Sequence, residues 1–251
     1  MLLCAVRDCH KPLTREEKRL VCPEGHSFDK ARSGYFNLLQ PQDRRSRHPG
    51  DTAEAVMARR RLHDRGVTAG LLAGIREILC IASDDLILDA GCGEGFYLGS
   101  LGRGAGVDIS AGAIDLAARR YPQCDWIVAN ADRFIPYSDA SFSVVLSITG
   151  RMNGAEFRRV LRPDGKLLAA IAAPDDLIEL RGTGRDRIER TVEAFSGQFR
   201  LVKQERVTTA AELDAEAVQD VLTSVYRPLR AQPVDAMRLT FSLDLLLLEA
   251  R

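Results

Sequence analysis

The chain lacks the long apolar runs of a membrane protein. No run in its 251 residues approaches the roughly 20 apolar positions that a helix needs to span a bilayer. The start, Met1-Leu2-Leu3, leads directly to Cys4 and then to charged residues, which is not the pattern of a secretory signal peptide. We therefore expect a cytoplasmic protein without membrane contact, whose six cysteines do not form a disulfide framework.

The chain also lacks an excess of charge of either sign, because 35 basic side chains balance 35 acidic ones. The balance is uneven along the sequence. Residues 1–66 carry fourteen lysines and arginines and nine acids, whereas the remainder carries twenty-one basic and twenty-six acidic residues. A basic front on an acidic body favours an anionic partner that docks at the front, although an excess of five charges also arises by chance.

Glycine is concentrated in one short segment that follows an apolar strand. Leu86-Ile87-Leu88 leads into Asp89-Ala90-Gly91-Cys92-Gly93-Glu94-Gly95, with glycine at every second position from Gly91. Glycines let a backbone turn tightly and approach a ligand where a Cβ would collide. The next residues are expected to start a helix, whose free N–H groups favour polar or anionic ligand groups. The spacing differs from the G-x-G-x-x-G of dinucleotide-binding proteins, and it predicts a small-molecule site.

A second expected strand, Gly106-Val107-Asp108-Ile109, carries an acid near its end. In a doubly wound sheet an acid at this place accepts hydrogen bonds from the hydroxyls of a ribose. The alternative is that Asp108 caps the following helix, a role that Ser110 would fill equally well. Together, the glycine segment and this acid favour a nucleoside ligand.

Several segments, in order, resemble the motifs of class I S-adenosylmethionine-dependent methyltransferases. Asp89 to Gly95 is similar to the first motif of that family, Asp108 to its ribose-binding acid, and Asn130-Ala131-Asp132 to the segment that cradles adenine. Leu161 to Leu167 resembles the turn before strand five. The resemblance implies an α/β fold with a Rossmann-like, mostly parallel seven-stranded sheet, and S-adenosyl-L-methionine as cofactor. It implies a cofactor-binding set of Asp89, Gly91, Gly93, Gly95, Asp108, Ile109, Asn130 and Ala131.

Three of the six cysteines and a histidine form two close pairs near the start of the chain. Cys4 and Cys9 are separated by four residues, Cys22 and His26 by three, and twelve residues lie between the pairs. Two such knuckles bring three thiolates and an imidazole to the corners of a tetrahedron around Zn²⁺. A segment of about 37 residues cannot stabilise itself by core burial alone, so a metal has a structural role there. His10 is a rival ligand, and the simpler alternative is three buried free cysteines and a surface histidine.

The chain divides into three expected parts: a zinc-binding module at residues 1–37, a linker with helices at 38–83, and a methyltransferase domain at 84–251. From residue 84 onward strands and helices alternate, which is typical of βαβ units and a parallel sheet. Helices are expected over 53–62, capped by Asp51 or Thr52, and over 71–81, 111–121, 155–161 and 215–225. Strands are expected over 166–173, 201–208 and 239–248.

Arginines cluster in and after the linker. Arg44, Arg45 and Arg47 lie in the linker itself, and Arg59-Arg60-Arg61 lie in the first expected helix. Arginine pairs with phosphates through two donors and stacks on bases, so these side chains are candidates for RNA contact. The alternative is a solvated linker and an ordinary charged helix face, which charge runs usually form.

The order of these features resembles a narrower family, the 23S ribosomal RNA guanine-N1 methyltransferases. The features are the Cys/His pairs, Gly34-Tyr35-Phe36-Asn37-Leu38-Leu39, Arg45-Ser46-Arg47-His48-Pro49-Gly50-Asp51 and Ala58-Arg59-Arg60, ahead of the class I domain. The resemblance implies zinc-assisted recognition of ribosomal RNA, methyl transfer to a guanine of an RNA hairpin, and a homodimer. By the same match, Cys4, Cys9, Cys22 and His26 are the zinc ligands.

Some positions depart from that family's pattern. Gly66-Val67-Thr68 stands where the family has Gly-His-Tyr, and Thr149-Gly150-Arg151 where it has an aromatic residue, alanine and proline. Two alternatives therefore stay open: a small-molecule methyltransferase whose zinc module serves stability alone, and a non-catalytic relative that binds the cofactor without turnover. Thr149 to Asn153 are expected to line the acceptor pocket, because ligands of open α/β sheets lie beyond the carboxyl ends of strands. The catalytic base is unassigned among Asp132, Asp175 and Asp176.

Overall fold

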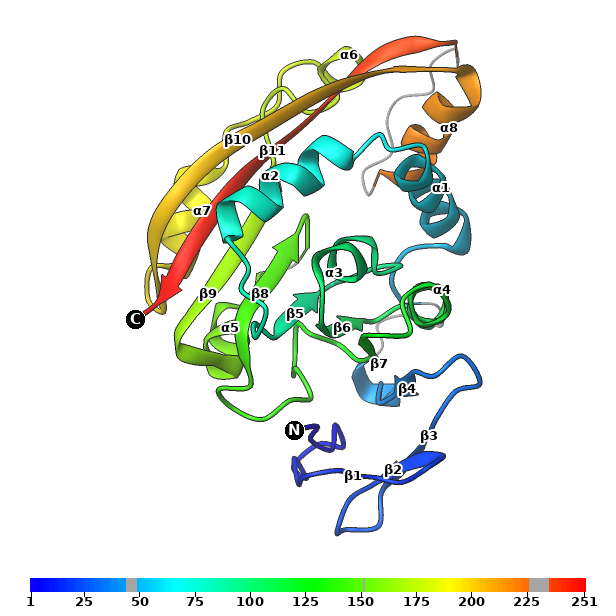
Figure 1. Ribbon diagram of the computed structural model, residues 1–251, viewed down its shortest axis with the longest axis vertical. Coiled ribbons are helices and arrows are strands. Elements are labelled where there is room, and N and C mark those ends of the chain that lie inside the picture. Colours follow the sequence, from blue (N-terminus) through cyan, green and yellow to red (C-terminus); the bar gives the residue numbers. More distant parts are fainter. Residues whose placement is uncertain (44–48, 151, 226–234) are drawn as a thin grey trace.

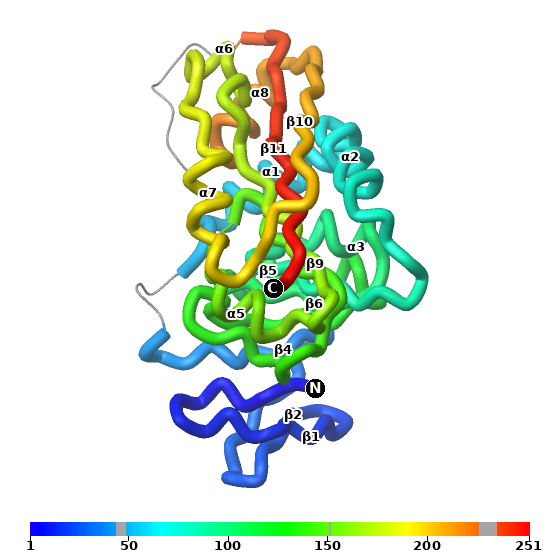
Figure 2. The backbone as a smooth tube through the Cα atoms, turned by 90° about the vertical axis from the view of Figure 1, so that its left-hand side faces the viewer, coloured from blue at the N-terminus to red at the C-terminus, as the bar shows by residue number. Residues whose placement is uncertain are grey.

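The computed structural model describes residues 1–43, 49–150, 152–225 and 235–251. The molecule is elongated, with the amino-terminal body at one end and a long antiparallel pair of strands reaching the other (Figures 1 and 2). The amino-terminal body contains a three-stranded antiparallel sheet of β1 (Thr14–Arg15), β2 (Arg19–Val21) and β3 (Ser27–Asp29). Arg44, Arg45, Arg47 and Arg151 lie outside the described residues, so what the sequence suggests for them stays a prediction.

The large sheet has eight strands in the order β10-β11-β9-β8-β5-β6-β7-β4. They are β4 (Phe36–Asn37), β5 (Ile87–Ala90), β6 (Gly104–Asp108), β7 (Asp125–Val128), β8 (Phe142–Ile148), β9 (Leu161–Ala172), β10 (Phe199–Leu213) and β11 (Met237–Ala250). The strands from β9 to β4 run parallel, whereas β11 is antiparallel to both β9 and β10. The predicted Rossmann-like, mostly parallel sheet is thus confirmed. Its seven expected strands gain an eighth, because β4 pairs with the edge of β7.

Helices cover both faces of this sheet (Figure 1). In the described residues they are α1 (Ala53–Asp64), α2 (Ala69–Leu79), α3 (Phe96–Leu101), α4 (Ala111–Arg120), α5 (Gly154–Val160), α6 (Ile178–Arg181), α7 (Ile188–Phe195) and α8 (Ala215–Ser224), with a short 3-10 helix η1 (Pro41–Asp43). All five helices that were predicted from the sequence are present, and each begins and ends within two residues of its predicted bounds. Thr52 caps α1 by accepting the N–H of Ala55, and Asp51 does not.

Two apolar cores lie on opposite faces of the sheet, because successive residues of a strand point to opposite sides. In β5, Ile87 joins the core under α2, α3 and α4, whereas Leu88 joins the core beneath α5 and α7. Leu2, Leu20 and Phe36 of the amino-terminal body are buried in that second core. The amino-terminal body is therefore joined to the large sheet by a shared core as well as by β4.

β10 and β11 form a long antiparallel pair, and they are the longest strands of the large sheet. The two strands pair from Phe199 opposite Ala250 to Leu213 opposite Met237, and β11 is also paired with β9 on its other side. Asp244 is 1 % exposed in the middle of β11, where Arg206 donates to both carboxylate oxygens at 2.7 and 3.1 Å. Both strands are longer than predicted, and α2 packs against the middle of β10, where Gly70 and Gly74 lie against Thr209 and Val207.

Candidate functional site

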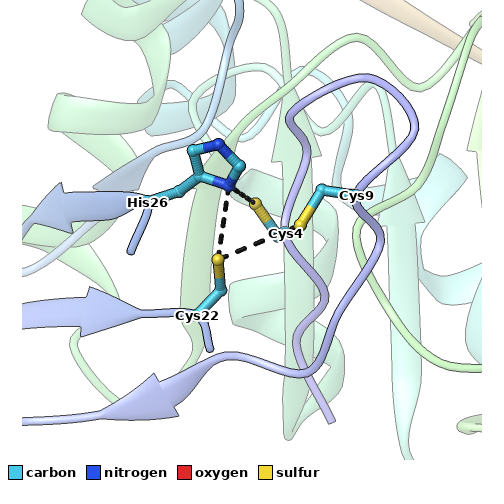
Figure 3. A group of neighbouring side chains, drawn as sticks. All are labelled: Cys4, Cys9, Cys22 and His26. Carbon is cyan, nitrogen blue, oxygen red and sulfur yellow. Dashed lines mark hydrogen bonds between the residues drawn. The ribbon is translucent and has the colours of Figure 1, made fainter. Parts of the chain in front are cut away.

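Four side chains of the amino-terminal body converge on one point (Figure 3). Cys22 directly follows β2, His26 directly precedes β3, and Cys4 and Cys9 flank the first turn of the chain. Their candidate ligand atoms all lie within 4.8 Å of one another. Cys22 Sγ lies 3.3 Å from His26 Nδ1, Cys4 Sγ 3.5 Å from the same nitrogen, and Cys9 Sγ 3.9 Å from Cys22 Sγ.

These separations fit the edges of a coordination tetrahedron. Zn–S bonds of about 2.3 Å and Zn–N bonds of about 2.0 Å give edges of roughly 3.5 to 3.8 Å. Burial raises the pKa of the Cys4 thiol, and the neighbouring thiols of Cys9 and Cys22 raise it further. A divalent cation removes that mutual repulsion by binding the thiolates, so the donor set suits Zn²⁺.

His10, the rival ligand, lies outside this cluster. Its ring stacks on Phe134 with ring centroids 4.1 Å apart and 12° between the planes. The guanidinium of Arg159 also lies over the Phe134 ring, 5.0 Å from its centroid. Phe134 follows the segment predicted to hold adenine, so the turn after Cys9 packs against the neighbourhood of the expected cofactor site.

The glycine segment forms a tight turn between β5 and α3. Gly91, Gly93 and Gly95 have positive φ angles of 87°, 54° and 80°. A Cβ at Gly91 would meet no atom within 4 Å, so the turn borders open space that can receive a ligand. Gly95 is required for another reason, because a Cβ there would collide with the Trp126 ring. Cys92 is buried in the core and does not line this open space.

Asp108 ends β6 beside the glycine turn. Its carboxylate accepts the backbone N–H of Gly93 at 3.0 Å and that of Ser110 at 2.8 Å. Ser110 caps α4, because its hydroxyl accepts the N–H of Ala113. Burial raises the pKa of Asp108, and the two N–H donors partly offset that rise. The acid thus ties the turn to the sheet at the position predicted for ribose recognition.

Two further acids are buried around the turn, with Asp89 2 % and Glu94 3 % exposed. Burial raises the pKa of Asp89 to about 8, and the charges of Asp108 and Glu94 add to the rise. Burial alone would raise the pKa of Glu94 as well, but His63 and Arg59 outweigh it and lower that pKa. Such a cluster of carboxylates favours a ligand that carries positive charge.

His63 of α1 links this cluster to the turn before α2. Its Nε2 lies 3.2 Å from Glu94 Oε1, and this oxygen has no aligned hydrogen-bond partner in the described residues. Its Nδ1 lies 2.6 Å from the hydroxyl of Thr68, and its ring stacks on Phe96 at 3.9 Å. Thr68 therefore supports His63, while the neighbouring Val67 is buried in the core.

The three arginines of α1 pair with carboxylates of the protein itself. Arg59 lies 2.6 Å from Asp51, Arg60 3.8 Å from Asp64 and Arg61 2.5 Å from Asp220 of α8. Each arginine of this run thus has an acidic partner within the protein, a setting that neither the RNA-contact prediction nor the solvated helix face described. Sequence reasoning missed that Arg59 reaches the glycine turn, because its partner positions are brought together only by the fold.

The segment after β7 is held from two sides. Asn130 donates from Nδ2 to the carbonyl of Asp43 in η1 at 3.0 Å, and its Oδ1 accepts the N–H of Asp132. Asn153 donates to the carbonyl oxygens of Ala131 and Asp132 at 3.2 and 3.0 Å. Ile109 and Ala131 stand at the carboxyl ends of β6 and β7, beside the turn that follows β5. All eight predicted cofactor residues therefore gather at one edge of the sheet, as parallel strands require.

The turn after β8 is strained. Thr149 has a φ of 50°, a left-handed conformation that is costly for a β-branched residue, and such strain clusters at functional sites. A Cβ at the next residue, Gly150, would lie 3.2 Å from the carbonyl oxygen of Ala90 at the end of β5. The predicted acceptor segment thus touches the end of the strand that carries the glycine turn.

The candidate bases lie in three different settings. Asp176 accepts the N–H of Ser242 at 3.1 Å and lies 3.6 Å from Arg181, which gives it a structural role beside β11. Asp175 Oδ1 lies 3.9 Å from Arg206. Asp132 is exposed beyond β7. This geometry selects none of them as the base.

Two family models match the chain where these sites lie. The model for the RlmA N-terminal zinc ribbon matches residues 3–47, and a methyltransferase domain model matches residues 87–165. The fold, the four-residue Cys/His cluster and these matches define an S-adenosylmethionine-dependent methyltransferase with an amino-terminal zinc ribbon. Its cofactors are S-adenosyl-L-methionine and Zn²⁺.

Curated relatives narrow the class to a family. A 23S rRNA (guanine(748)-N(1))-methyltransferase of Streptomyces fradiae is 34 % identical, over 85 % of this chain and 81 % of its own. Proteins of Micromonospora griseorubida and Bacillus subtilis, both assigned as 23S rRNA (guanine-N(1)-)-methyltransferases, are 36 % and 35 % identical, over 71 % and 82 % of this chain and 68 % and 79 % of theirs. The chain belongs to the 23S rRNA (guanine-N1)-methyltransferase family.

Solved structures share the fold at low sequence identity. A Bacillus halodurans protein assigned as a methyltransferase superposes with a TM-score of 0.51 at 14 % identity, covering 71 % of this chain and 97 % of its own. A chain from a Haloferax volcanii complex of a methyltransferase with its activator Trm112 gives 0.51 at 17 % identity, over 80 % and 98 %. Among the described residues, no helix is both long enough and apolar enough to cross a membrane.

Proposed function

We propose that this protein transfers the methyl group of S-adenosylmethionine to N1 of a guanine in 23S ribosomal RNA. The observation that carries the proposal is that a zinc cluster is joined to the sheet of the cofactor turn through β4 and a shared core, in a chain whose relatives are named for this reaction. A ribbon packed beside the cofactor segment offers a second surface, which a large RNA substrate can contact and a metabolite does not need. The basic excess of residues 1–66 supports an anionic substrate.

The proposal assigns roles to the residues gathered at the two sites. Cys4, Cys9, Cys22 and His26 would hold Zn²⁺, and Asp89, Gly91, Gly93, Gly95, Asp108, Ile109, Asn130 and Ala131 would hold the cofactor. The proposed division is a zinc module at 1–37, a linker at 38–83 and a catalytic domain at 84–251, with β4 as the point of attachment.

S-adenosylmethionine supplies an electrophilic methyl group on a positively charged sulfur. Held at the glycine turn and Asp108, it would supply this methyl group to guanine N1, with the bonding electron pair staying on sulfur and the N1 proton leaving to a base or to water. The protein's part is mainly to position the two reactants and to keep the sulfonium in a field of carboxylates. A guanine inside a duplex is inaccessible, so the proposed substrate is an unpaired or flipped base.

The test uses the purified, zinc-loaded protein, methyl-labelled S-adenosylmethionine and 23S rRNA that lacks its native modifications. Label at one guanine, with a stop of reverse transcription at that position, is the expected result, because an N1 methyl group blocks Watson–Crick pairing. Asp108→Asn should lose the label, whereas Asp115→Asn is the matched control, because this half-buried acid of α4 binds Ser33 and Arg119 and does not contact the glycine turn.

Two other outcomes separate the alternatives. Bound cofactor without label on any RNA identifies a non-catalytic relative, and label on small molecules of a cell extract but not on RNA identifies a small-molecule methyltransferase. A homodimer is also part of the proposal, and light scattering of the purified protein tests it. A ribosomal RNA substrate would put the enzyme in the cytoplasm, and the proposal includes that setting.

A further inference from the structure

The expected cofactor carries one anionic group in an otherwise cationic molecule, and the glycine turn is surrounded by acids. Asp51, Asp89, Glu94 and Asp108 all lie at or beside the turn. These carboxylates suit the sulfonium and the ammonium of S-adenosylmethionine, but they repel the carboxylate of its methionine part. A cation that reaches the turn must therefore offset that repulsion.

Arg59 is a cation placed at this point. Its Nη1 would lie 3.4 Å from a Cβ on Gly93, so the guanidinium lies beside the turn. Both hydrogen bonds that it makes within the described residues use the other terminal nitrogen, Nη2, which donates to Asp51 at 2.6 Å and to the carbonyl of Ser224 at 3.3 Å. These two acceptors fix the fork, and they leave Nη1 directed to the turn without a partner in the described part of the chain.

We propose that Arg59 binds the carboxylate of the methionine part of S-adenosylmethionine, and that Asp51 positions its guanidinium for that contact. This inference rests on the proposed function, because it needs the cofactor at the glycine turn. The anion would accept from Nη1, and the guanidinium would then bridge the ligand and Asp51. Arg59 is thus a cofactor-specificity residue contributed by α1, outside the methyltransferase domain match.

The neighbouring arginines of α1 do not offer the same contact. Arg60 faces Asp64 within its own helix, and Arg61 donates from two nitrogens to Asp220 of α8. Arg60 is the matched control, because its side chain has the same 30 % exposure as that of Arg59 and pairs with an acid as well.

The experiment compares two ligands that differ only in this carboxylate, S-adenosylmethionine and its decarboxylated form, by calorimetry on the zinc-loaded protein. Arg59→Gln should weaken binding of S-adenosylmethionine by about 10- to 100-fold, the effect of losing a charge-assisted hydrogen bond. Binding of the decarboxylated ligand should change by less than about threefold, since the contact in question is absent from it. Arg60→Gln should leave both affinities unchanged.

Arg59→Lys keeps the positive charge but loses the planar guanidinium. Its affinity for S-adenosylmethionine should lie between those of the wild type and Arg59→Gln, while its affinity for the decarboxylated ligand should not change. This result separates carboxylate recognition from a general loss of folding. Equal weakening of both ligands by Arg59→Gln, or no weakening of either, overturns the inference. Failure of the proposed function is seen earlier and separately, because the wild-type protein would then bind neither ligand or would bind without methylating RNA.

Discussion

The zinc cluster and the cofactor site differ in how far along the chain their residues are spread. The four Cys and His residues lie between positions 4 and 26, and their spacing alone indicates a tetrahedron. The proposed cofactor site gathers residues from Asp51 to Ala131, supplied by three strand ends, the turn before α1 and α1 itself. A site whose residues lie close together in the sequence can therefore be predicted from their spacing. For a site assembled from distant segments, the sequence reveals only the one continuous segment, here the glycine turn.

The largest loss of stability is expected from disrupting the zinc cluster. Cys22→Ser should release Zn²⁺ and unfold the amino-terminal body, because structural zinc in small modules contributes about 10 to 16 kcal/mol of apparent binding energy. Zinc content and limited proteolysis of residues 1–37 are the measurements. Cys80→Ser, at an exposed cysteine, is the control.

The Cys22→Ser variant also tests whether the cofactor site depends on zinc. Binding of S-adenosylmethionine to Cys22→Ser should stay within about threefold of wild type, because the glycine turn and Asp108 belong to elements that zinc does not hold. Loss of cofactor binding together with zinc would show that the two sites are one cooperative unit.

Replacing either of two glycines of the turn by alanine adds one methyl group, but the two variants should lose different properties, stability in one and cofactor binding in the other. Gly95→Ala should destabilise the fold by about 2 to 4 kcal/mol, because it adds a collision with Trp126 to the strain of a positive φ. Gly91→Ala adds only the strain, about 1 kcal/mol, but its Cβ enters the open space and should abolish cofactor binding. Thermal unfolding and calorimetry separate the two outcomes, and a stable Gly95→Ala protein would contradict the packing described.

A smaller effect is expected from pH. Because burial raises the pKa of Asp89 to about 8, the native state holds a proton that the unfolded chain releases near pH 4, so the free energy of unfolding should fall as pH rises from about 4 to 8. Affinity for the cationic cofactor should rise over the upper part of the same range, as Asp89 ionises. Asp89→Asn should flatten both profiles, and an affinity independent of pH in the wild type would argue against Asp89 as a partner of the cation.

The smallest effect concerns the ion pair between Arg15 of β1 and Asp125 of β7, which bridges the amino-terminal body and the large sheet at 2.9 Å. Both side chains are 51 % exposed, so Asp125→Asn should cost at most about 0.5 kcal/mol. Leu2→Ala, which truncates a buried contact between the same two bodies, should cost about 2 kcal/mol or more. Chemical denaturation measures the free energy of unfolding of both variants. A larger loss for Asp125→Asn would show that the ion pair, rather than the shared core, holds the two bodies together.

The sequence was sufficient for the alternation of strands and helices from residue 84, for the glycine turn and for the Cys/His cluster, because each follows from local periodicity or spacing. It was insufficient for Arg59, which lies in a run of three arginines that differ only in what the fold places beside them. It also missed β4, since two residues carry no periodic signal, and the strain at Thr149, since a threonine in a left-handed conformation is held there by its surroundings.

The position of β11 sets the order in which this protein can be completed during synthesis. β11 lies between β9 and β10, although residues 237–250 are made after both. Until they leave the ribosome, the apolar edge of β9 has no neighbour, and β10 cannot join the sheet. Such an unpaired edge is open to association with other chains, so a nascent chain that stalls before residue 237 exposes a surface prone to aggregation.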